Sequence, residues 1–172
     1  MRVEPQCLAA IHNIDSMTVN EYYEYVERLA SEHKLIGHTA KEPHYFRGEL
    51  EEFYTDLRNK VRFPALIAES FELTFDEDGK TRETSYIVAA AYKESKNWGN
   101  IYSAMSLCEH IGDEVLRRIM HDAAEGEICA NVEAIQAVPL LDEQHLYAGM
   151  RYTIRLNTAM DWEPDDDEWS AE

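Results

Sequence analysis

Acidic residues around a glycine near the centre of the chain first raise the possibility of a calcium-binding loop. Asp76 and Asp78 precede Gly79. If Asp78 held the fifth ligand position, the first would be Thr74 and the twelfth would be Ser85, which cannot supply the bidentate carboxylate that Ca²⁺ needs there. The same residues suit a polar turn, because Asp-Gly favours the positive φ angles of a tight hairpin. We therefore predict a turn and no calcium site.

A metal-dependent nuclease or hydrolase is the second chemistry that the residues suggest. Glu94-Ser95-Lys96 has the acid-x-lysine spacing of metal-dependent nucleases, in which an upstream Asp completes the metal site. The upstream Asp76 and Asp78 lie at the predicted hairpin tip, whereas Glu94 closes the second strand. At about 3.3 Å per residue, these carboxylates would lie tens of ångströms apart. The alternative enzyme therefore depends on three residues: Glu69, Glu94 and Lys96.

The seven histidines and three cysteines show no metal-binding or nucleophilic pattern. His110 and His121 would face the same side of one helix about three turns apart, too far for one shared ion. Cys108 lies on the apolar stripe of that helix and is interpreted as a core residue. Three other histidines have irregular spacing in a loop-rich region: His33, His38 and His44. We therefore predict no catalytic, cofactor-binding or metal-binding residues, and no enzyme activity.

Composition and charge limit the classes of partner. The chain has 172 residues, 45% of them apolar, and a formal net charge of -18, which argues against a surface that clamps nucleic acid. Residues 161–172 contain seven acids and no base. This pattern predicts a disordered acidic tail, and Trp162 and Trp169 keep a docking peptide as the alternative.

The expected compartment follows from the cysteines and the hydropathy. An odd cysteine count, without metal-type spacing or a basic region before an N-terminal apolar run, favours a reducing cytoplasm. No segment approaches the roughly 18 consecutive apolar residues of a membrane span. We expect a protein that is cytoplasmic during assembly, with no membrane partner.

Two helices are predicted before the central hairpin. Thr18 and Glu21 have capping-box spacing, and a helix over 18–34 follows with an apolar stripe at helical spacing. A second helix is predicted from about Arg47 to Lys60. Five tyrosines in this region suit either core packing or protein contacts: Tyr22, Tyr23, Tyr25, Tyr45 and Tyr54.

From Ala65 onward, alternating apolar residues predict a hairpin with its turn at Asp78-Gly79. In that register, residue 71 faces 86, 67 faces 90 and 65 faces 92. One face would then carry Ile67, Phe71, Tyr86, Val88, Ala90 and Tyr92. Glu69 would fall on this apolar face opposite Val88, so it must lie near an edge, be paired, or indicate a different register.

A long helix and two strands complete the expected fold. An apolar stripe predicts a helix over 100–121 that packs on the hairpin. Alternation predicts strands over 132–138 and 150–156, with a loop over 140–148. The fold class is therefore α+β: an antiparallel or mixed sheet of about four strands on one long helix, with additional N-terminal helices. We divide the chain into a helical extension (1–46), a core domain (47–160) and the tail (161–172).

The order of these elements resembles that of tail-completion and tail-terminator proteins of tailed bacteriophages. The likeness covers about residues 47–158 and is carried by five runs: FPALIAESFELTF, TSYIVAAAY, NIYSAMSLCEHIGDEVLRRIMHD, NVEAIQAVPL and GMRYTIRLNT. It implies a non-enzymatic subunit of a ring, commonly hexameric, that caps the tail tube and joins it to the head. Other tail or neck proteins would be its partners, and the virion a further location. The first 45 residues and the acidic tail depart from that pattern.

Three classes of function follow. The leading hypothesis, which the resemblance implies, is a ring-forming tail terminator or head–tail joining subunit. The strong negative charge is compatible with it, because such charge lowers friction with DNA that slides through a ring. The alternatives are the small metal-dependent nuclease or hydrolase and an acidic, DNA-mimicking adaptor.

Overall fold

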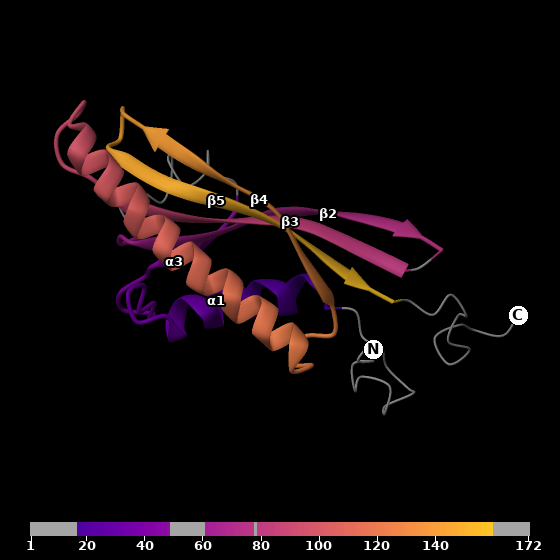
Figure 1. The fold of residues 1–172 in the computed structure, drawn as a ribbon. Coiled ribbons are helices and arrows are strands. Elements are labelled where there is room, and N and C mark those ends of the chain that lie inside the picture. Colours follow the sequence, from indigo (N-terminus) through magenta and orange to yellow (C-terminus); the bar gives the residue numbers. More distant parts are fainter. Residues whose placement is uncertain (1–16, 49–60, 78, 160–172) are drawn as a thin grey trace, which may run out of the picture.

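The protein folds as an α+β structure, as the sequence predicted. A computed structural model describes residues 17–48, 61–77 and 79–159. Figure 1 shows the helices of residues 19–32 and 98–124 on one side of a twisted sheet, with the hairpin of residues 65–91 projecting beyond them. The elements in chain order are α1 (Val19–Glu32), β1 (Tyr45–Arg47), β2 (Ala65–Asp76), β3 (Gly79–Ala91), α3 (Trp98–Ala124), β4 (Asn131–Asp142) and β5 (Tyr147–Thr158).

The five strands form one mixed sheet in the order β1-β2-β3-β5-β4. The three-residue β1 is parallel to β2, and every other neighbouring pair is antiparallel. β4 therefore forms one side of the sheet, and β1 with β2 forms the other. We call the face toward α1 and α3 the helix face, and the opposite one the back face.

α1 begins where the sequence predicted. The Thr18 side chain accepts a hydrogen bond from the backbone N–H of Glu21, whose carboxylate accepts one from the Thr18 backbone. This capping box satisfies donors that the first turn would leave unpaired. Tyr22, Tyr25 and Leu29 recur at helical spacing and are buried against the sheet.

α3 lies across β3 and β5 and confirms the predicted packing on the hairpin. Its stripe of Ile101, Cys108, Ile111 and other apolar residues is buried in the main core. Two stacked tyrosines from the strands reach the helix: Tyr86 donates a hydrogen bond to the Gly112 carbonyl, and Tyr152 donates to Asp113. A Cβ at Gly112 would lie 2.1 Å from the Tyr152 ring, so glycine permits this close approach.

The predicted hairpin exists, but its register was wrong. Phe71 faces Thr84, Ile67 faces Ile87 and Ala65 faces Ala89, and the closing pair is Asp76 with Gly79. The register shifts between Ala68 and Phe71, which is a β-bulge with one extra residue on β2. Because of this bulge, Tyr86 and Val88 share the helix face with Leu66, Ala68 and Phe71, whereas Ile67 lies on the back face.

Other boundaries also differ from those predicted. The sheet has five strands where about four were expected, because the short β1 has no alternating pattern long enough to recognise. Arg47 is in β1 and does not begin a helix; residues 49–60 of that predicted helix lie outside the described ranges. The expected loop over 140–148 is mostly strand, since β4 continues to Asp142 and β5 begins at Tyr147.

Candidate functional site

The residues of the supposed calcium loop form a turn. Asp76 accepts a hydrogen bond from the backbone N–H of Gly79 at 3.1 Å, and Gly79 has φ +141°. The Asp76 carboxylate therefore closes the chain reversal. Asp78 lies outside the described residues, so its predicted place in the turn stays a prediction.

The residues of the alternative enzyme lie in different parts of the fold. Glu69 is buried in the β2 bulge and forms an ion pair of 2.7 Å with Arg151 on β5. Glu94 and Lys96 are exposed in the connection after β3, where Glu94 accepts a hydrogen bond from the Asn97 side chain. Within the described part of the chain, no three His, Cys, Asp or Glu side chains are placed to hold a metal ion.

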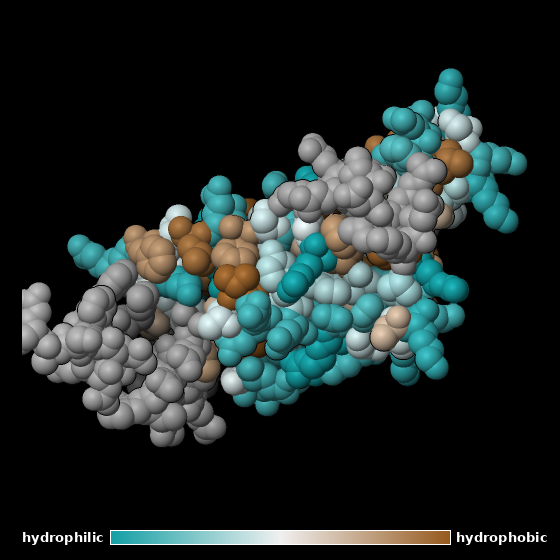
Figure 2. Space-filling model, turned by 180° about the vertical axis from the view of Figure 1, so that it is seen from behind, coloured by the Kyte–Doolittle hydropathy of each residue, from teal (hydrophilic) through white to brown (hydrophobic). Residues whose placement is uncertain are grey.

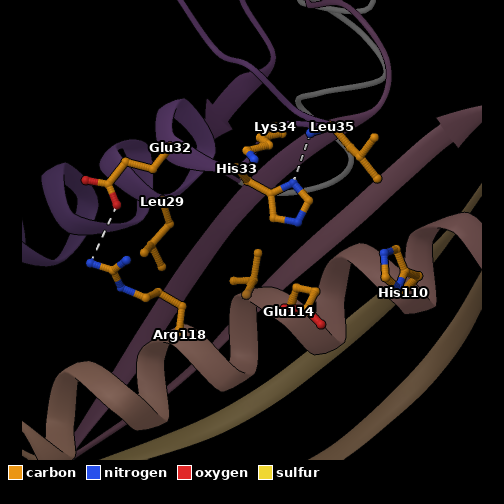
Figure 3. A pocket seen from close by; sticks show the side chains of 9 residues that line it. Leu29, Glu32, His33, Lys34, Leu35, His110, Glu114 and Arg118 are labelled. Carbon is orange, nitrogen blue, oxygen red and sulfur yellow. Dashed lines mark hydrogen bonds and ion pairs between the residues drawn. The ribbon is translucent and has the colours of Figure 1, made fainter.

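A cleft of about 370 Å³ lies between the end of α1 and the middle of α3. Figure 3 shows Glu32 and His33 on one wall, and His110, Glu114 and Arg118 on the other. His33 and His110 line the same cleft, which sequence spacing did not predict because the two residues belong to different elements. Leu29 and Val115, which belong to the core, also line the cleft.

The cleft has mixed charge. The ε-nitrogen of Arg118 donates to Asp122, and an outer nitrogen lies 3.7 Å from Glu32. Burial lowers the pKa of His33, and nearby His110 lowers it further, while Glu114 opposes the shift. His33 accepts a hydrogen bond from the Leu35 backbone, so the ring also fixes the chain at the helix end. The cleft therefore combines acids and bases in similar number and favours neither ion class.

Asp122 is a buried carboxylate that joins the two helices. It accepts hydrogen bonds from the Tyr25 hydroxyl at 2.9 Å and from Arg118 at 2.6 Å, and Arg28 lies 3.7 Å away. Burial and the bond to Asp122 raise the pKa of Tyr25. A buried carboxylate with these partners is satisfied structurally, and Asp122 is not among the residues that line the cleft between α1 and α3.

Cys108 and the described tyrosines belong largely to the core. Burial raises the pKa of the Cys108 thiol to about 12, which keeps it protonated at neutral pH and confirms its interpretation as a core residue. Tyr22 and Tyr25 are buried, and Tyr23 and Tyr45 pack against the same cluster. Tyr54 lies outside the described residues.

The flank of the sheet at β4 is a surface available to a partner. β4 has twelve residues, most of them exposed, and among the described strands it pairs only with β5. A strand at a sheet edge presents backbone N–H and C=O groups on its outer side. β4 also contains Pro139, a residue confined to edge strands and bulges, and a bulge at Ile135. Additional pairing is therefore expected along its first residues, Asn131–Ala134.

Apolar side chains are exposed near both flanks. Leu73 on β2, and Ile135 and Leu141 on β4, are each more than a third exposed. Figure 2 shows hydrophobic side chains gathered on the left half of one side of the molecule, while hydrophilic side chains cover most of the rest. On α3, Trp98 and Tyr102 are about half exposed and lie 5.8 Å apart between ring centroids. Exposed aromatic pairs of this kind are typical anchors of protein interfaces.

The back face of the outer sheet is polar. Glu72, Thr74, Glu83 and Arg155 line a shallow hollow of about 380 Å³ there, together with neighbouring residues of β3, β4 and β5. Arg155 joins Glu83 at 3.0 Å and Glu133 at 3.3 Å. One arginine among several carboxylates suits a solvated strand surface.

No protein-family model and no curated protein matches the chain. Among the described residues, neither helix has the length and apolar character needed to cross a membrane.

Proposed function

We propose that this protein is a non-enzymatic subunit that joins copies of itself into a ring, in the role of a phage or prophage tail terminator or head–tail joining protein. The observation that carries the proposal is the sheet with strand edges at both flanks, β4 on one side and β2 beyond the short β1 on the other. Two different flanks of one sheet can form a head-to-tail contact, and such contacts close into rings when the rotation between copies allows it.

The charge supports the same role. A net charge of -18 repels DNA phosphates, so a ring with this composition would let DNA pass without holding it. Three of the candidate chemical residues support it in another way, because they have structural roles: Asp76 caps a turn, Glu69 pairs with Arg151, and Cys108 is core.

Native mass spectrometry and light scattering of the full chain, at several protein and salt concentrations, test self-assembly. We expect one discrete oligomer larger than a dimer, with a ring visible by negative-stain electron microscopy. A strict monomer under all conditions contradicts the proposal. The virion role has a separate test: adjacent genes for capsid, portal or tail-tube proteins are expected, and their absence counts against it.

A further inference from the structure

We infer that the first residues of β4, Asn131–Ala134, add as an antiparallel strand to Phe71–Thr74 of β2 in a second copy, so that the sheet continues from subunit to subunit. This inference rests on the proposed self-assembly and names the surfaces that perform it. The partner is thus a second copy of this chain.

Strand direction permits this contact. β2, β3, β5 and β4 alternate in direction across the sheet, because each neighbouring pair is antiparallel. If the next copy is related by a shift along the sheet with a small rotation, its β2 keeps the direction of the first. It therefore runs antiparallel to the adjacent β4, which is the commoner pairing.

Among the described strands, each flank has a stretch without a neighbouring strand, and these two stretches lie at the same level in the sheet. Following the residue pairs from strand to strand, Thr74 is level with Thr81, Asn157 and Asn131. Phe71 is level with Ala134 in the same way, through Thr84 and Ile154. β1 pairs only with Leu66–Ala68, so it does not reach this level.

The part of β4 that resists further strand pairing, at Pro139, lies at a different level of the sheet. Pro139 is level with Met150, Val88 and Leu66, where β1 already pairs with β2 through Tyr45. Proline lacks the N–H that a strand partner would need. At that level, β4 and the next copy's β1 would both lie beside the next copy's β2. β4 must therefore separate from that β2 after the bulge at Ile135, and the contact is confined to Asn131–Ala134.

The side chains match face by face in this register. On the helix face, Val132 would lie opposite Leu73 of the next copy, and Ala134 opposite Phe71. Leu73 is 37% exposed in the single chain, so this contact would cover it. On the back face, Asn131 would meet Thr74. Apolar and polar pairs thus fall on separate faces, as sheet pairing requires.

One pair in this register is unfavourable. Glu133 would lie opposite Glu72 of the next copy, and like charges directly across strands repel. Arg155 already contacts Glu133 at 3.3 Å and lies in the same row, so it partly offsets the repulsion. The contact is therefore expected to be reversible and to respond to salt.

The helices fit the same arrangement. α3 lies over β3 and β5, and α1 lies over β1 and β2. In the part of the chain that the structure describes, most residues of β4 are exposed. With strands about 4.8 Å apart, α1 of the next copy would lie about 10–12 Å from α3, close to the usual helix-packing distance. The flank of α3 that carries Trp98 and Tyr102 would then lie beside that helix.

A disulfide-crosslinking experiment tests the contact. The full chain carries Thr74→Cys and Asn131→Cys, with Cys7→Ser and Cys129→Ser to remove other reactive thiols. Paired residues on antiparallel strands have Cα atoms about 4.5–5.5 Å apart, within disulfide range. Oxidation should give a ladder of linked species up to the ring size. Docking should make it on the order of 100-fold faster than in the control Thr74→Cys/Gln136→Cys, because the effective thiol concentration becomes millimolar.

The outcomes separate this inference from the proposed function. A second pair, Glu72→Cys/Glu133→Cys, gives the same ladder if the register is correct and serves if the first variant fails to fold. A wild-type oligomer with crosslinking no faster than in the control overturns the β4–β2 contact and leaves self-assembly standing. Linked dimers without a ladder indicate a two-fold contact and also overturn it. A wild-type chain that stays monomeric overturns both.

Discussion

The two ends of the back face are built from the same strands but have opposite character. At the end beside β1, Ile67, Ile87 and Tyr147 form a second buried cluster. At the other end, Glu72, Glu83 and Arg155 surround a polar hollow. One end is therefore closed on both sides of the sheet, and the other has an apolar core only beneath the helices. The end beside β1 therefore contributes buried apolar area, whereas the other end leaves its polar back face exposed to solvent or to a partner.

The buried cluster should carry much more of the free energy of unfolding than the polar end. Ile87→Ala removes a side chain that is 1% exposed, so a loss of about 2–4 kcal/mol is expected from lost burial and the cavity left behind. Ser85→Ala, on the same strand and face, removes only a hydroxyl contact with Thr153 and should cost about 1 kcal/mol or less. Urea denaturation of both variants measures the difference. Equal losses of unfolding free energy in the two variants would contradict the proposed difference between the two ends.

Local signals in the sequence predicted the helices correctly, and a non-local irregularity made the predicted strand register wrong. The capping box and the apolar stripes are local signals, so α1 and α3 were predicted nearly to their ends. The hairpin register was not, because strict alternation has no place for the extra residue of the β2 bulge. Ile67 was therefore assigned to the wrong face. Its apolar character suits either face, since the sheet is buried on both sides at that level.

The candidate surface was less predictable than the fold. Nothing in the Asn131–Ala134 sequence shows that β4 lies at a sheet edge, because strand order depends on contacts between residues distant in the chain. Pro139 is the one local signal, since proline is rare in central strands. The meeting of His33 with His110 likewise depends on how α1 packs on α3. Spacing within one element cannot reveal either feature.

Gly149 gives a second test of how tightly the closed end is packed. A Cβ on Gly149 would lie 2.6 Å from the Val88 carbonyl oxygen, a backbone atom that cannot move aside cheaply. Gly149→Ala should therefore destabilise the protein by about 1–3 kcal/mol through overpacking. The control is Gly99→Ala, whose Cβ would meet only the Asn97 side chain at 3.5 Å. Thermal unfolding should show a lower midpoint for the first variant and little change for the second.

Two ion pairs, one near each end, are expected to differ least in their contribution to the free energy of unfolding. They test specifically whether the closed end is shielded from solvent. Glu69–Arg151 lies near the closed end, with the Glu69 side chain 9% exposed, whereas Glu83–Arg155 lies in the polar hollow with Glu83 48% exposed. Glu69→Gln should cost about 1–2 kcal/mol, because the half-buried Arg151 guanidinium loses its charged partner. Glu83→Gln should cost about 0.5 kcal/mol or less, since solvent screens an exposed pair.

Salt separates the two pairs further. Raising sodium chloride to about 1 M shortens the screening length to roughly 3 Å, which weakens exposed pairs far more than buried ones. The effect of Glu83→Gln on the free energy of unfolding should therefore vanish at high salt, and that of Glu69→Gln should persist. Urea titrations of wild type and both variants at low and high salt supply the comparison. If the Glu69→Gln effect also vanished, the closed end would be open to solvent at this pair, and the contrast between the two ends would fail there.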